Sequence, residues 1–147
     1  MLDDLTRRLQ AALPATVPVL PPEQILLPAE WQEEDASGDL VPNGERGLHV
    51  YLRQQAPDGY VQIETPEPIT TTGNQDTYWT AVAAIAGTAE QAAALATQIR
   101  TALTGTPPAD PGWYKLVIPA RHAPIAPGAH LARATYTRTL LLGQLPN

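Results

Sequence analysis

The feature that most constrains the fold is an apolar segment that leads directly into a capped helix. Residues 78–86 read Tyr-Trp-Thr-Ala-Val-Ala-Ala-Ile-Ala. Both alternating faces of this run can be covered by other elements, which favours a central strand. Thr88, with Gln91 three residues later, forms a capping-box signature. The sequence therefore predicts a strand over 78–86 and a separate helix over 89–104.

The predicted helix is amphipathic and has a clear end. One face carries small and aliphatic side chains: Ala92, Leu95, Ala96, Ile99, Ala102 and Leu103. Gly105 follows the last of them, just before Pro107 and Pro108, which is the expected glycine stop. A second helix is predicted over 2–13, where leucines recur at helical spacing until Pro14.

Period-two alternation and turn residues predict the remaining elements. In residues 48–53 the alternation places Leu48, Val50 and Leu52 inward, which predicts a strand. This strand is expected to form a hairpin with 60–64 through Asp58-Gly59. Further strands are expected over 113–118 and 131–142. The segments between them are predicted as a proline-rich connector or short edge strands over 14–28, an acidic loop over 31–47, a projecting loop over 65–76 and a proline-rich loop over 119–130.

These elements predict an α+β fold in one domain, residues 1–147. The expected architecture is a single mixed or antiparallel sheet, with the N-terminal helix and the second amphipathic helix packed on one face. A chain of this length typically forms one core. Because the chain has no Phe and only three Trp, that core is expected to be aliphatic and thin.

The charge distribution excludes some partners and suggests another. The net charge is −6 and Lys115 is the single lysine, which argues against a nucleic-acid surface. Residues 1–75 hold 12 acids and 4 bases, whereas 76–147 hold 3 acids and 5 bases. Acidic loops that keep the chain soluble would explain this asymmetry. Head-to-tail pairing between copies is the sharper alternative.

The chain shows no motif for catalysis, a metal or a cofactor. It has no Cys and a single serine, Ser37, outside any Gly-x-Ser-x-Gly elbow. Glycine-rich phosphate loops are absent, and the loop histidines His122 and His130 match no usual metal spacing. The sequence predicts no enzyme, no cofactor and no membrane span. It shows no secretory signal, so folding is expected in the cytosol.

The order of elements resembles the tail terminator, or tail-completion, proteins of long-tailed bacteriophages. The resemblance is carried by residues 2–13 and 76–103, a strand, a short turn and an alanine-rich helix that ends in Arg100-Thr-Ala-Leu103. The proline-rich 14–28 connector and the acidic 30–47 loop depart from the family pattern. They are alternative candidates for contact arms.

This resemblance implies a structural virion protein that assembles in the host cytoplasm. Such a protein forms a homo-oligomeric ring, usually a hexamer, which caps the tail tube, ends its polymerisation and docks to the head or neck. Its partners would be the tail tube protein and a connector protein. The candidate interface residues are Glu33, Glu34, Asp35, Thr72, Asn74, Arg100, Arg121, His122, Arg133 and Arg138. The alternatives are a head-completion or neck connector subunit, a related toxin-system or secretion-tube component, and a small enzyme or ligand-binding domain.

Overall fold

The computed structural model describes residues 2–24, 36–38, 47–72, 75–105, 114–126 and 128–141, without the side chains of 70–72, 75 and 139–141. Within these residues the chain forms three helices and six strands. In order they are α1 (Leu2–Ala12), β1 (Val19–Leu20), α2 (Leu48–Gln54), β2 (Tyr60–Ile63), β3 (Glu67–Thr72), β4 (Gln75–Ala86), α3 (Ala89–Thr104), β5 (Lys115–Ala126) and β6 (Ala129–Leu141).

One mixed sheet organises the fold. Its strands follow the order β1-β2-β4-β6-β5, and β3 pairs with the part of β4 that β2 does not reach. The pairing of β1 with β2 is parallel and all other pairings are antiparallel. Strand β4 pairs with β6 along its whole length, from Gln75 opposite Leu141 to Ala86 opposite His130. The predicted α+β class and the central place of β4 are confirmed.

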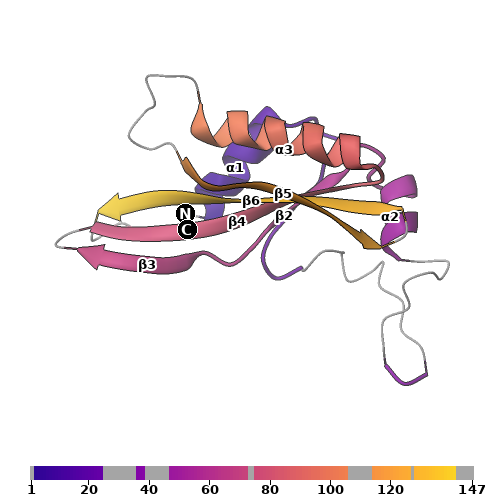
Figure 1. The fold of residues 1–147 in the computed structure, drawn as a ribbon, viewed down its shortest axis with the longest axis horizontal. Helices are drawn as coiled ribbons and strands as arrows, with labels where there is room; N and C mark the ends of the chain where they lie inside the picture. Colours follow the sequence, from indigo (N-terminus) through magenta and orange to yellow (C-terminus); the bar gives the residue numbers. More distant parts are fainter. Residues whose placement is uncertain are drawn as a thin grey trace.

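Helices α1 and α3 cover one face of the sheet (Figure 1). Leu5 and Leu9 of α1 and Leu95 and Ile99 of α3 are buried against the inward side chains of β2, β4 and β6. The predicted cap of α3 is present, because the Thr88 side chain accepts a hydrogen bond of 3.1 Å from the Gln91 amide. The two helices and the face that they cover therefore match the sequence prediction.

Residues 48–54 form helix α2, so the predicted strand over 48–53 is wrong. Leu48, Tyr51 and Leu52 also recur at helical spacing, and in α2 Tyr51 and Leu52 are buried against the opposite face of the sheet. The Tyr51 ring meets Tyr60 of β2 edge-on, with centroids 5.4 Å apart. Packing on the sheet thus decides between two periodicities that this short segment carries equally.

The predicted 48–64 hairpin is consequently wrong as well. Asp58-Gly59 turns the chain from α2 into β2. Gly59 has φ of 89° and donates its amide to Ala56 O. A Cβ at this position would lie 2.8 Å from Ile85 O, so the turn needs glycine for its conformation and for its close approach to β4.

Two predicted loops contain strands. The 65–76 segment includes β3 and the start of β4, and the 119–130 segment includes the second half of β5 and the start of β6. Proline usually interrupts a sheet, but β5 pairs only with β6 and so leaves its other edge free of described strands. Pro119 and Pro124 are tolerated at such an edge, where the register shifts around them.

Strands β3, β4 and β6 continue beyond the helices at one end of the sheet (Figure 1). We call this end the arm: residues 67–72, 75–79 and 137–141, which pair from Trp79 to Gln75 with a register shift in β3 between Pro68 and Thr70. Within the described residues, the single large apolar side chain classed as exposed, Ile69 at 40 %, lies in the arm. Tyr78 and Arg138 at the base of the arm contact the helix layer, and the strands beyond them extend past the described helices (Figure 1).

Candidate interaction surface

The structure places some of the predicted interface residues and leaves others outside its description. Glu33, Glu34, Asp35 and Asn74 lie outside the described residues, and Thr72 is described only by its backbone at the end of β3. The predictions that rest on them stay predictions. The five basic residues of the set, Arg100, Arg121, His122, Arg133 and Arg138, are all described.

Arg138 lies in a network that joins α1 to the sheet. Its guanidinium donates to Asp4 Oδ2 and, at 3.3 Å, to Tyr114 Oη, and it stacks 5.3 Å from the Tyr114 ring centroid. Arg8 Nε also donates to Asp4 Oδ2, at 3.0 Å. Burial raises the pKa of Asp4, but the charges of Arg138 and Arg8 outweigh it and hold that pKa below its usual value. A partner that binds Arg138 has to compete with these internal bonds.

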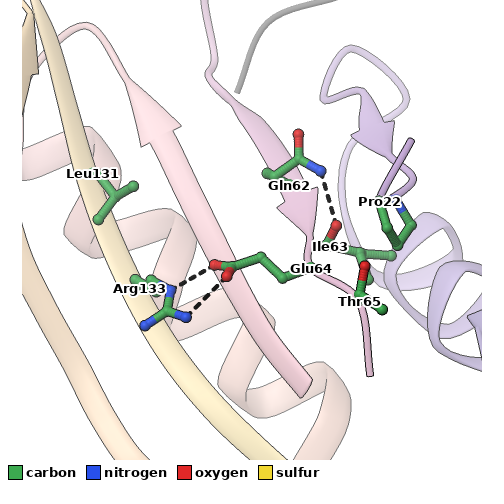
Figure 2. A pocket seen from close by; sticks show the side chains of 7 residues that line it. All are labelled: Pro22, Gln62, Ile63, Glu64, Thr65, Leu131 and Arg133. Carbon is green, nitrogen blue, oxygen red and sulfur yellow. Dashed lines mark hydrogen bonds and ion pairs between the residues drawn. The ribbon is translucent and has the colours of Figure 1, made fainter. Parts of the chain in front are cut away.

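Arg133 forms a bidentate ion pair with Glu64 on the face of the sheet opposite α1 and α3. Its Nε and Nη2 donate to the two carboxylate oxygens at 2.5 Å and 2.9 Å. Figure 2 shows the Glu64 side chain reaching across the sheet to Arg133 on β6. These hydrogen bonds raise the pKa of Arg133, although its partial burial opposes them. The pair is about half exposed on the arginine side, so its contribution to stability is modest.

Two adjoining cavities flank this ion pair. The first, about 480 Å³, is bounded by Pro22, Ile63 and Leu131, with the Glu64–Arg133 pair at its wall (Figure 2). The second, about 320 Å³, lies towards Trp79 and Ile118. Both share Glu64, Thr65 and Arg133. We call this hollowed region the open face, because none of the described helices covers it.

Arg121 lies directly beside Arg133. The two residues are cross-strand partners of β5 and β6, so their side chains leave the same face of the sheet. Like charges in register repel each other, and Glu64 neutralises only Arg133. Arg121 is exposed and forms no ion pair within the described part of the chain. It is therefore a cation that an acidic partner could bind without displacing an internal bond.

Arg100 and His122 meet at a groove on the other side of β5. Both line a cavity of about 150 Å³ between α3 and β5, with Tyr136 also in its lining. Burial raises the pKa of Tyr136 to about 12, against the opposing charge of Arg100. The volume is that of a single side chain. The cavity is large enough for one carboxylate, and its lining contains no Asp or Glu of its own.

The groups that would support an enzyme line different cavities, and two of the histidines lie on neighbouring strands. Glu64 lines the open face, whereas His49 lines a different cavity beside Arg53, Gly87 and Gly128. His122 and His130, predicted to share a loop, lie on β5 and β6. No cluster of three metal-ligating side chains occurs in the described ranges. None of the helices described is long and apolar enough to cross a membrane.

Sequence reasoning missed three charged residues of this surface as interface candidates: Glu64, Glu67 and Lys115. Glu67 and Lys115 are exposed, and both sit at the same level of the sheet, since Glu67 pairs with Trp79, Trp79 with Thr137 and Thr137 with Lys115. Their alternation with apolar neighbours was the available signal, but it could not show which strands become edges.

No protein-family model matches the chain, and no curated protein matches its sequence.

Proposed function

We propose that this chain is a structural assembly subunit that forms a ring and acts as a tail terminator: the ring caps a phage tail tube, ends its polymerisation and docks to the head or neck. The observation that carries the proposal is the arm. Three paired strands extend beyond the helix layer (Figure 1) and include the exposed Ile69. A sheet end that the described helices leave uncovered is suited to contact with another subunit.

The charge distribution supports assembly between copies. Arg121, on the edge strand β5, has no internal ion pair among the described residues. Glu67, on the edge strand β3 across the sheet, has none either. Opposite charges on two different surfaces favour heterologous contacts, which close into rings when the rotation between copies permits. The resemblance of residues 2–13 and 76–103 to tail terminators supplies the particular role within that class.

The first experiment measures the mass of the purified chain by light scattering and images it by negative-stain electron microscopy. A ring is expected at low salt, and a strictly monomeric chain at high concentration contradicts the proposal. Incubation with purified tail tubes tests the specific role. A terminator is expected to cap tube ends and limit their length, whereas a neck connector leaves tube length unchanged.

A variant of the arm provides the control for surface specificity. Ile69→Lys places a charge at the exposed apolar position of the arm and is expected to weaken assembly and capping together. Gln98→Lys places the same charge on the exposed side of α3, outside the groove of Arg100 and His122, and is expected to leave both unchanged. Equal effects of the two variants would remove the arm from the contact.

A further inference from the structure

The strands at the two edges of the sheet carry opposite charge. Strands β5 and β6, residues 115–126 and 129–141, contain four bases and two histidines but no acid. On the other side, residues 19–24 and 60–72, which include β1, β2 and β3, contain three acids and no base. The charge difference between the two halves of the sequence thus becomes a charge difference between the two edges of one sheet.

We propose that copies bind head to tail, with the β5 edge of one copy against the β3 edge of the next. Neighbouring sheets would then join edge to edge around the ring. This inference rests on the proposed ring. The basic surface consists of Lys115 and Arg121 on the open-face side of β5 and of His122 with Arg100 on the helix side. The acidic surface consists of Glu67 on β3 and Glu23 after β1.

Strand direction is compatible with this contact. Strand β3 runs antiparallel to β4, and β5 runs parallel to β4 because β6 is antiparallel to both. In copies related by rotation about an axis along the strands, β3 therefore meets the neighbouring β5 in the antiparallel sense, like most pairs within this sheet. Both outer edges are free of partner strands in the described chain.

Prolines limit where the edges can join. Pro68 interrupts β3 near its start and Pro119 interrupts β5 after four residues. Edge prolines prevent indiscriminate pairing. The stretches that keep their amides are 69–72 of β3 and 115–118 of β5, so the backbone contact is short and the charged side chains select the partner. These two stretches lie at different heights along the strand direction. Tilted strands in closed barrels produce an offset of this kind.

Like-to-like contacts are disfavoured by the same charges. A two-fold contact between β5 edges places Lys115 and Arg121 near their own copies, and a two-fold contact between β3 edges does the same for Glu67. The heterologous contact alone brings acid to base. It generates a ring or an open array rather than a closed dimer.

Charge reversal provides the first test. One variant carries Lys115→Glu and Arg121→Glu, and a second carries Glu23→Lys and Glu67→Lys. Each alone is expected to assemble about tenfold more weakly than the wild type in low salt, where reversed surface pairs repel. An equimolar mixture is expected to recover assembly, because one variant has two acidic sides and the other two basic sides. Assembly of either variant alone at wild-type strength overturns the proposal.

Cross-linking distinguishes head-to-tail from two-fold contact, and the chain has no native cysteine to interfere. Antiparallel pairing of 69–72 with 115–118 brings Glu67 close to Arg121 of the neighbouring copy. Glu67→Cys and Arg121→Cys are therefore prepared as separate proteins, mixed and treated with a short thiol-to-thiol reagent. Mixed pairs are expected to exceed both homopairs, and the double variant should give a ladder of oligomers. Homopairs in excess, or no cross-link, overturn the edge contact. If the wild type still caps tail tubes, the proposed function survives; a ladder without capping removes the function and keeps the contact.

Discussion

Tyr60 illustrates how a single side chain reflects its surroundings. It is fully buried between α2 and the sheet, and its hydroxyl has no hydrogen-bond partner among the described residues. Burial raises its pKa, and the nearby Tyr51 adds to the effect. A buried hydroxyl without a partner loses its hydration and gains nothing in return.

Tyr60→Phe is therefore expected to be neutral or to stabilise the fold by up to about 1 kcal/mol. Tyr60→Ala, which removes the ring as well, is expected to cost about 3–5 kcal/mol. Urea unfolding followed by far-UV circular dichroism measures both. A loss above 1 kcal/mol in Tyr60→Phe would mean that the hydroxyl has a partner after all.

Asp4 is expected to make stability depend on acid pH. Its pKa in the folded chain lies below the ordinary value of 3.8, so its contribution is complete above that value and is lost as pH falls through the lowered pKa. Asp4→Asn should lower stability at pH 7 by about 2 kcal/mol, because it leaves Arg138 without its carboxylate.

The difference between Asp4→Asn and the wild type should shrink as pH falls below the ordinary pKa of 3.8 and through the lowered pKa of Asp4. Denaturant midpoints at several pH values measure it. Asp3→Asn is the matched control, since Asp3 is exposed in the same helical turn; it is expected to change stability by less than about 0.5 kcal/mol. A pH-independent difference for Asp4→Asn contradicts the assignment.

At the scale of elements, local signals succeeded where a segment is long or capped. Helix α3 and strand β4 were predicted because each has a long, consistent pattern: sixteen residues in α3 and nine in the predicted strand 78–86. Patterns of this length favour one conformation over its competitors. Helix α2 was missed because seven residues fit two periodicities. Strands β3 and β5 were shortened or missed because proline signals a break, and only the sheet order shows that these strands are edges.

The cap of α3 gives a prediction at this scale. Thr88→Ala is expected to lower stability by about 1 kcal/mol, since the Gln91 amide loses its acceptor. Thr97→Ala removes a hydroxyl that bonds Ala93 O within the helix, and it is expected to be neutral or slightly stabilising. Equal losses in thermal or urea unfolding would show that Thr88 acts as an ordinary helix residue.

For the whole molecule, the distribution of charge is expected to determine how strongly copies associate. Contacts between exposed charges are screened at high salt, whereas the partly buried Asp4–Arg138 pair is screened less. Raising sodium chloride from about 0.05 M to about 0.5 M shortens the screening length from roughly 14 Å to 4 Å. We expect the proposed ring to dissociate over this range while circular dichroism stays constant. Unchanged mass by light scattering would indicate an apolar interface instead.

The candidate surface could be predicted only in part. Arg100, Arg121, Arg133 and Arg138 were expected at an interface from their charge, and His122 from its place in the predicted 119–130 loop. The structure brings Arg121 beside Arg133 and Arg100 beside His122. It also shows that Arg133 and Arg138 are bound internally by Glu64 and Asp4. These partners lie 69 and 134 residues away in sequence, a separation that no local pattern encodes.

The sequence by itself determined the α+β class, the strand-to-helix unit of β4 and α3 with its cap, the helical start, and the charge difference between the two halves. These features depend on interactions within a few residues, which a pattern records directly. The tertiary structure alone decided that α2 is a helix, that β3 and β5 are edges, and that acids and bases line opposite sides of the sheet. These follow from pairing and packing between distant segments, which set burial and therefore the conformation of every short, ambiguous stretch.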